Sequence, residues 1–311
     1  GGTGFRNPVD LAVADNDVVY VVNRSYENRP DGVRVSIVTH DEELIGEFAS
    51  YGDGDGQLTW PTAIALDGNG RVYIADEWLN RITIFDKDGN YLSKWGTPGS
   101  GDGELNGPAA LAITSDGNML VSDAGNHRLQ KFSLDGQYLA QCGSFGSGPG
   151  QFNRPWGLGL DADDNVYVAD WRNDRIQKLS PAGECLAICG SSGSAVGQFN
   201  RPSDVCVDQD GDMYVADRQN DRVQVFAPDG RFLVVLRGDN QLSKWGKEKL
   251  QSNPDMIRQR ALAIAHDGGE FEKRFSHPCA VRVDAQNRIL VLDHTRGRIQ
   301  VYSKTPDPVL V

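Results

Sequence analysis

Cysteine and histidine offer the widest chemistry in this sequence, and neither is spaced as a known metal or redox site. The five cysteines are Cys142, Cys185, Cys189, Cys206 and Cys279. An odd number cannot all pair within the chain, and the spacing is not that of a zinc site. Cys185 and Cys189, on one strand, would lie roughly 13 Å apart, too far for a disulfide. Unpaired cysteines favour a reducing compartment, so the expected localisation leans towards the cytoplasm.

The other residues with catalytic potential form no recognisable constellation. The histidines are His40, His127, His266, His277 and His294. No nucleophile elbow, phosphate-binding loop or dinucleotide fingerprint occurs in its required context. The glycine-rich stretch 52–56 alternates Gly with Asp, whose charge repels phosphate. The sequence therefore identifies no catalytic residue and no metal ligand set.

A repeat of 47 residues organises the chain. Prolines that open an apolar run fall at Pro8, Pro61, Pro108, Pro155, Pro202 and Pro278. A second series ends the following run, at Asn23, Asp76, Asp123, Asp170, Asp217 and Asp293. Both series have the separations 53, 47, 47, 47 and 76, and an arginine follows each of the last five markers by five residues. Two series that agree at every step indicate a true structural repeat.

Each repeat predicts four short strands. In one unit they are Pro202 to Val207, Met213 to Ala216, Arg222 to Phe226 and Phe232 to Leu236. Apolar residues alternate with period two, and Asp-Gly pairs mark tight hairpins between strands. Six four-stranded antiparallel sheets around one axis make a β-propeller. The predicted fold is therefore all-β, a six-bladed propeller, with residues 1–311 as one domain.

The repeat resembles the NHL repeat. The resemblance rests on the segment Asn200 to Val205, the run Tyr214 to Asp217, Asn220 and the run Arg222 to Phe226. Its copies cover nearly the whole chain. The resemblance implies a propeller, whereas function varies within such folds among binding platforms, RNA-binding modules and enzymes.

Two departures from the 47-residue period mark insertions. The first adds about six residues in the segment Arg24 to Gly32 of the first blade. The second adds 29 residues, since 76 minus 47 is 29, within about 239–276, between blades five and six. Asn253 and Pro254 there are suited to begin a helix that continues through an apolar stripe to Asp267. It is expected to be either a lid or docking helix, or a decoration packed on the rim.

Parity decides which face of the propeller holds a site. If the strands of a blade are a to d, the b–c and d–a loops emerge on one face, and the a–b and c–d loops on the other. The second face has short Asp-Gly hairpins, whereas the first has the long loops and both insertions. Variable loops on one face mark the binding side, so the first face is predicted to bind.

Residues that break the repeat on this face are the candidate contacts. Aromatic and Arg side chains together can anchor a ligand or peptide, although they can also pack between blades. The predicted ligand- or partner-binding residues are Trp156, Trp171, Arg172, Arg218, Asp204, His277 and His294. Trp60 and Trp78 also break the repeat on this side.

The recurring Asp and Arg are expected to be structural. A carboxylate ending strand b beside an Arg starting strand c can pair locally and satisfy loop backbone groups. The run Asp208 to Asp212 mimics a calcium loop, but it lacks the distal Glu and coincides with a hairpin turn.

Metal chemistry is tested through the resemblance. Lyases that cleave peptidyl-hydroxyglycine resemble this repeat and hold zinc through histidines, some directly after the strand-opening proline. Here those positions are Val9, Thr62, Ala109, Trp156, Ser203 and Cys279, none of which is His. Propeller lactonases use channel carboxylates, and Asp10 and Asp204 occupy such positions without a convincing Glu. No cofactor is expected, but a divalent cation in the channel stays open.

The overall charge limits the partners. A net charge of -12 opposes phosphate backbones and anionic lipid, which argues against nucleic acid and membranes. Arg154, Arg172, Arg201 and Arg218 could form a basic strip, yet RNA binding calls for a more basic face.

The prediction is thus a non-catalytic scaffold that binds a protein, peptide or small-molecule ligand on the b–c and d–a face. The alternative is a metal-assisted hydrolase or lyase at the channel mouth, with His277 and His294 as acid or base.

Overall fold

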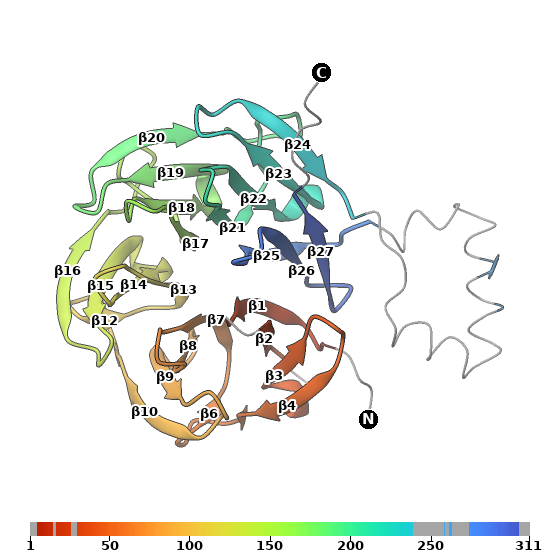
Figure 1. Ribbon diagram of the computed structural model, residues 1–311. Coiled ribbons are helices and arrows are strands. Elements are labelled where there is room, and N and C mark those ends of the chain that lie inside the picture. Colours follow the sequence, from red (N-terminus) through yellow and green to blue (C-terminus); the bar gives the residue numbers. More distant parts are fainter. Residues whose placement is uncertain are drawn as a thin grey trace.

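Six sheets surround a central axis in the computed structural model, which describes residues 5–14, 17–25, 30–238, 258, 261–262 and 274–304 (Figure 1). Five sheets have four described strands and the sixth has three. Within each sheet, neighbouring strands in the chain pair antiparallel. The all-β class and the six-bladed propeller are therefore confirmed.

The strands of each blade run outward from the axis in chain order. Blade one is β1 (Pro8–Val13), β2 (Val18–Asn23), β3 (Arg34–Thr39) and β4 (Leu44–Phe48). Blade two is β7 (Pro61–Leu66), β8 (Val72–Asp76), β9 (Arg81–Phe85) and β10 (Tyr91–Trp95). Blade three is β13 (Pro108–Ile113), β14 (Asn118–Asp123), β15 (Arg128–Ser133) and β16 (Tyr138–Cys142).

The remaining blades follow the same order. Blade four is β17 (Pro155–Leu160), β18 (Val166–Asp170), β19 (Arg175–Leu179) and β20 (Cys185–Cys189). Blade five is β21 (Pro202–Val207), β22 (Met213–Asp217), β23 (Arg222–Phe226) and β24 (Phe232–Leu236), one residue longer in its second strand than predicted. Blade six is β25 (Pro278–Val283), β26 (Arg288–Asp293) and β27 (Arg298–Ser303).

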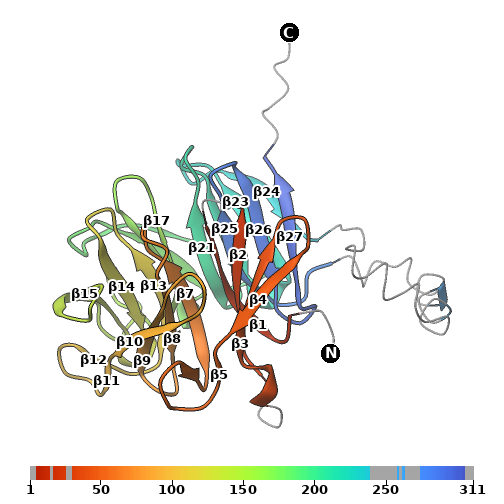
Figure 2. The ribbon, with the colours of Figure 1, turned by 60° about the horizontal axis from the view of Figure 1, so that its bottom comes forward.

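Short elements complete the loops. Two parallel pairs lie between blades: β5 (Ser50–Tyr51) with β6 (Gln57–Leu58), and β11 (Thr97–Pro98) with β12 (Glu104–Leu105). Four 3₁₀ turns join second strands to third strands: η1 (Pro30–Gly32), η2 (Ala124–Asn126), η3 (Trp171–Asn173) and η4 (Arg218–Asn220). In the tilted view, η1 projects from the end of the first blade (Figure 2).

The hydrophobic core lies between the blades. Both faces of the inner strands are buried, as in β8, where every residue is inaccessible. Six apolar clusters result, one at each blade interface, including the interface of blades six and one. The outer strands, such as β20, have mostly exposed or half-buried residues. Stability therefore depends on each blade having a neighbour on both sides.

The chain is not continuous across the seam between blades six and one, so polar contacts join it. The Cys279 thiol donates to the carbonyl oxygen of Pro8 at 3.3 Å, beside the apolar cluster that includes Leu11 and Leu290. Arg288 pairs with Asp17 on the opposite face of the ring. Within the described residues, noncovalent contacts join the seam.

An ion triad spans three blades near the axis. The guanidinium of Arg282, in blade six, donates to Asp10 of blade one at 2.7 Å and also to Asp204 of blade five. Each carboxylate also accepts an N–H from the next blade, Asp10 from Ile64 at 2.9 Å and Asp204 from Val281 at 2.9 Å. Burial raises the pKa of Asp204 to about 6 even with Arg282 beside it. The triad joins the two interfaces on either side of blade six.

Parts of two sequence predictions lie outside the described residues. The expected fourth strand of blade six, Val309 to Val311, is not described. The helix expected within 239–276 is described only at Arg258, Ala261 and Leu262, whose backbone is helical and whose side chains are exposed. No described helix is long and apolar enough to span a membrane.

We expect Arg282→Met to destabilise the protein by about 3 kcal/mol, because it leaves two buried carboxylates without their cation. Urea unfolding measures the change. Adding Asp10→Asn and Asp204→Asn should recover part of the loss, since the amides still accept the backbone N–H groups. The exposed Arg231→Met is the control, with an expected change within about 0.5 kcal/mol. An Arg282→Met change as small as that of the control would show that the triad does not hold the ring.

Candidate functional site

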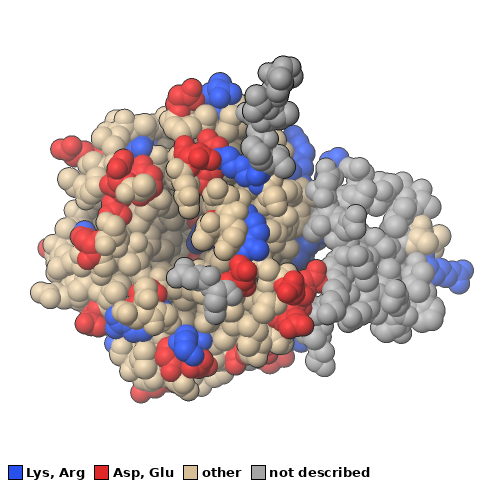
Figure 3. Space-filling model, in the orientation of Figure 1, with Lys and Arg blue, Asp and Glu red and all other residues tan. Residues whose placement is uncertain are grey.

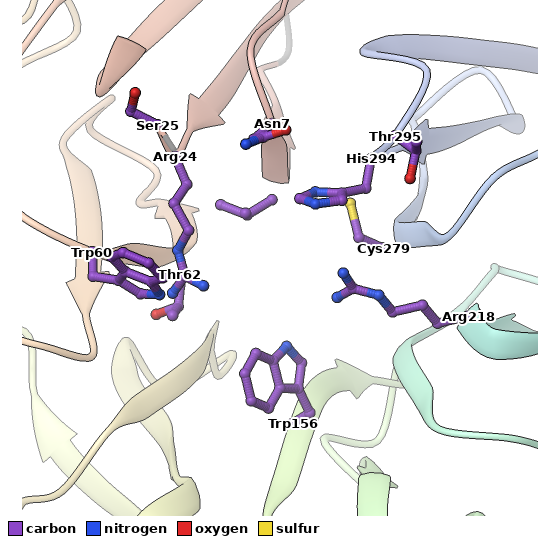
Figure 4. Close-up of a pocket in the computed structure, with 11 residues that line it drawn as sticks. Asn7, Arg24, Ser25, Trp60, Thr62, Trp156, Arg218, Cys279, His294 and Thr295 are labelled. Carbon is purple, nitrogen blue, oxygen red and sulfur yellow. The ribbon is translucent and has the colours of Figure 1, made fainter. Parts of the chain in front are cut away.

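A cavity of 440 Å³ opens at the channel mouth on the face of the b–c and d–a loops (Figure 4). It lies on the face that parity predicted. Its walls are Asn7, Val9, Arg24, Ser25, Trp60, Thr62, Trp156, Arg218, Cys279, His294 and Thr295. None of these lining residues is acidic.

Two rings of equivalent positions supply most of the wall. The proline ring consists of the residues that directly follow the strand-opening prolines, and it contributes Val9, Thr62, Trp156 and Cys279. The marker ring consists of the residues that directly follow Asn23 and its aspartate equivalents: Arg24, Glu77, Ala124, Trp171, Arg218 and His294. The propeller brings both rings to one end of the channel, so residues more than 250 positions apart face one cavity (Figure 4).

A buried carboxylate in each of blades two to six, and Asn23 in blade one, fixes these positions. Asp170 is fully buried and accepts the backbone N–H of Asn153 at 2.8 Å, in the loop before Trp156. The same side chain accepts from Nε of Arg175 at 2.8 Å. A backbone bond from Arg172 to the Asn153 carbonyl, 3.0 Å, ties η3 to this loop.

The predicted pairing of marker carboxylates with strand-c arginines is confirmed in four blades. It joins Asp123 to Arg128, Asp170 to Arg175, Asp217 to Arg222 and Asp293 to Arg298. In blade two, Arg81 instead donates to the carbonyls of Asp53, Gly54 and Gln57.

Tryptophans form two sides of the cavity. Trp156 packs against Trp171 with ring centroids 5.6 Å apart. Trp171 does not line the cavity itself, but it supports Trp156 from behind and is covered by the guanidinium of Arg201, 4.9 Å from its ring. Trp60 forms another side of the cavity, where the guanidinium of Arg24 lies 4.5 Å from its ring. Flat aromatic walls with nearby cations suit a ligand with a planar or apolar part.

The two lining arginines differ in their partners. Arg24 is held by Glu77 at 2.7 Å and donates to the Pro61 carbonyl at 3.2 Å, and its burial lowers its pKa. The Arg218 side chain makes no hydrogen bond or ion pair with any residue that the structure describes. Figure 4 shows it pointing into the cavity from η4. Of the two lining arginines, Arg218 is therefore the one that has no partner among the described residues and can bind a ligand.

The hydrogen bonds of His294 set its tautomer. Its Nδ1 lies 2.8 Å from the carbonyl oxygen of Pro8, which can only accept, so Nδ1 carries the proton. In the neutral ring, Nε2 then has a free lone pair, and the ring points into the cavity (Figure 4). Burial lowers the pKa of His294, and the charges of Arg218 and Arg24 lower it further. At neutral pH the cavity thus contains an uncharged imidazole.

The other predicted residues lie around the cavity rather than in its wall. His277 contacts Thr295 through Nδ1 at 3.2 Å, and its backbone N–H is donated to Asp221 at 2.7 Å. Arg172 is exposed beside Trp171, 5.7 Å from its ring. Asp204 is buried deeper in the channel, where Arg282 joins it to Asp10. Of the predicted set, Trp156, Arg218 and His294 line the cavity.

Two places bear on metal binding. A cation held by Asp10 and Asp204 would have to displace Arg282, whose guanidinium already pairs with both. On the opposite face, ligand atoms of Asp17, His40 and Asp284 lie within 4.8 Å of one another, but Arg288 pairs with both carboxylates. A resident guanidinium thus pairs with each acidic group at both places.

Arg24 was not among the predicted contacts, although the sequence holds a signal for it. Arg24 directly follows Asn23, the first-blade equivalent of the aspartates that precede Trp171, Arg218 and His294. Because Asn replaces Asp in this blade, the alignment does not stand out from the sequence. The residues that directly follow the marker positions of the six blades include three of the lining side chains, Arg24, Arg218 and His294.

Comparisons with known proteins agree with the geometry. The chain matches the NHL repeat family at residues 152–179 and 199–226, in blades four and five. It matches a 6-bladed beta-propeller family at residues 63–139. The fold thus defines a six-bladed propeller. NHL repeats are present in blades four and five. No curated protein matches it in sequence.

Solved structures with this fold include proteins of different kinds. A protein of unknown function from Bacteroides thetaiotaomicron has a TM-score of 0.64 and 20% identity, covering 96% of this chain and 70% of that one. A catalytically inactive virginiamycin B lyase from Staphylococcus aureus with quinupristin has a TM-score of 0.58 and 12% identity. The match covers 95% of this chain and 84% of that one. A chain of a nidogen/laminin complex has a TM-score of 0.55 and 19% identity, and the match covers 74% of this chain and 79% of that one. These likenesses concern the fold alone.

We expect His294 to titrate below its ordinary pKa of 6.5, and Arg218→Gln to raise that pKa, because one repelling positive charge is removed. Proton NMR of the imidazole ring against pH measures both. Because the pKa of His294 is lower in the folded protein than in the unfolded chain, His294 decreases the free energy of unfolding progressively as the pH falls below 6.5. Arg231→Gln, in a turn on the other face, should leave the titration unchanged. An unshifted His294 in Arg218→Gln would contradict this account.

Proposed function

We propose that this propeller is a binding protein whose channel-mouth cavity takes an anionic ligand or the acidic end of a larger partner. The observation that supports this most is the Arg218 guanidinium, which faces a cavity without a lining carboxylate and has no partner in the described residues. A charged group that is half removed from water and unpaired gains most from an incoming opposite charge.

The cavity differs from the rest of the molecule in charge. The protein has 43 acidic and 31 basic residues other than His, and a pI near 4.9. On the face shown in Figure 3, Lys and Arg lie interspersed with Asp and Glu around the ring. At the cavity, Arg24 and Arg218 face the same space, and the one carboxylate bonded to them, Glu77, already neutralises Arg24. The uncompensated charge is therefore that of Arg218.

The walls limit the rest of the ligand. Trp60 and Trp156 provide flat apolar surfaces, and Val9 and Cys279 add small apolar ones. A cavity of 440 Å³ is at the small end of the range for metabolite sites. A carboxylate or phosphate attached to a ring or short apolar group matches this combination. The same features suit the last residues of an acidic peptide chain.

We expect anionic probes to bind and their neutral counterparts not to bind. Suitable pairs are benzoate with benzamide, phenylacetate with phenylacetamide, and phenyl phosphate with phenol, titrated by calorimetry or by fluorescence of the cavity tryptophans. Arg218→Gln should weaken the anions by 10-fold or more, since a hydrogen bond to a charged group contributes about 1.5–3 kcal/mol.

Arg231→Gln changes the net charge equally and should bind as the wild type does. The proposal fails if none of the three anions binds, if the neutral partners bind equally well, or if both arginine variants lose the same affinity.

A second candidate function is proton-transfer catalysis, favoured by the tautomer of His294. Its neutral Nε2 faces the cavity beside Arg218, an arrangement in which a base could take a proton while a guanidinium holds the developing charge. Hydrolysis of p-nitrophenyl acetate tests it: turnover above background that His294→Gln abolishes would support a hydrolase. Equal rates in the wild type and in His294→Gln would leave binding as the function.

A further inference from the structure

Three arginines beside the cavity have no carboxylate or hydrogen-bond partner for their side chains among the described residues. Arg154, Arg172 and Arg201, here called the arginine strip, make no side-chain hydrogen bond or ion pair with any described residue, and Arg154 Nε and Arg201 NH1 are buried without a partner. By contrast, the arginines that begin three third strands form buried ion pairs with carboxylates: Arg128, Arg175 and Arg222. A cluster of unpaired guanidinium groups indicates a surface that binds negatively charged groups.

The arginine strip is continuous with the cavity. Trp156 lines the cavity and packs on Trp171, and Trp171 is in turn flanked by Arg201 and Arg172. The backbone N–H of Arg154 donates to Nδ1 of His127 at 3.0 Å. Burial lowers the pKa of His127, and the charges of Arg154 and Arg172 lower it further. A line of positive charge therefore runs from Arg218 in the cavity to Arg154 at the edge of blade four.

We propose that the ligand is an acidic peptide segment, with one carboxylate in the cavity at Arg218 and further acidic side chains along the arginine strip. This rests on the proposed function of the cavity. The two sites are joined by packed side chains, so a single chain reaching both gains from their proximity. In an extended peptide, the side chains on one face recur about every 6.6 Å, so a short acidic run presents several charges to the strip.

A peptide fits this surface better than a nucleic acid does. Single-stranded RNA binds through exposed aromatic faces on which its bases stack. Trp171 is already covered by Arg201 and packed on Trp156, so it is not a free stacking surface. The strip is also short, and the net charge of -12 repels a long phosphate backbone beyond it.

The experiment titrates three probes. The first is the peptide Ser-Gly-Asp-Glu-Asp-Phe with a free terminal carboxylate, the second is Ser-Gly-Asn-Gln-Asn-Phe, and the third is decauridylate RNA. We expect the first to bind most tightly and to weaken as salt is raised. The triple variant Arg154→Gln, Arg172→Gln, Arg201→Gln should lose roughly 30-fold in its affinity, about threefold for each guanidinium removed.

A matched control separates the strip from net charge. The triple variant Lys87→Gln, Lys131→Gln, Arg231→Gln removes the same charge on the opposite face and should bind the acidic peptide as the wild type does. The strip triple variant should keep wild-type affinity for phenylacetate, which reaches only the cavity. If phenylacetate binds but the strip variant binds the acidic peptide normally, the strip proposal fails and the cavity proposal stands. Failure of phenylacetate itself concerns the cavity, and tighter binding of RNA than of the acidic peptide overturns the choice of partner.

Discussion

The buried carboxylate at the end of the second strand in blades two to six is the interaction on which the binding face depends. Asp170 holds the loop before the first strand, the 3₁₀ turn after the second and the arginine that starts the third. Asp217 does the same one blade later, through Asn200, Asn220 and Arg222. Loops of this length would otherwise have many conformations, and any site built from them would be poorly defined. The carboxylates thus convert loops into fixed supports for the cavity wall.

Electrostatics separates what stabilises this protein from what is available for binding. Most described arginines of the inner channel and strands already form ion pairs. Arg282 pairs with two aspartates, Arg24 pairs with Glu77, and most strand-c arginines pair with the marker carboxylates. On the face of the b–c and d–a loops, the side chains of Arg154, Arg172, Arg201 and Arg218 make no hydrogen bond or ion pair with a described residue, and they lie on or beside blades four and five, near Trp156 and Trp171. Because acidic residues outnumber basic ones overall, this local excess of positive charge contrasts with the rest of the molecule, and it distinguishes one part of the face from the others.

Much of the fold could be predicted because it follows from a period and a parity. The 47-residue repeat fixed the number of blades, and the antiparallel order of strands fixed the face to which each loop belongs. Trp156, Arg218 and His294 were found because they break the repeat on that face. The strand-b carboxylates were correctly taken as structural, since a residue that recurs in every blade serves the blade.

Other features depend on contacts that a single sequence does not reveal. Arg282 joins Asp10 and Asp204 across sequence separations of 272 and 78 residues, so nothing local pairs them. Without Arg282, the two aspartates resemble cation ligands in the sequence. The neutral tautomer of His294 likewise depends on a Pro8 carbonyl 286 residues away. The difference in partners between Arg24 and Arg218 is visible only once Glu77 is placed beside one of them.

The proline ring and the marker ring have a consequence for how such a protein can change. Trp156 and Arg218 face the cavity from these rings and make no side-chain hydrogen bond to another blade within the described residues. Thr62, Cys279 and His294 line the same cavity but also bond to the next blade. Substitutions at Trp156 and Arg218 would therefore change the ligand preference with little effect on folding. Duplicated blades would start identical and diverge at these few sites, and a library randomised there would sample new specificities on an intact scaffold.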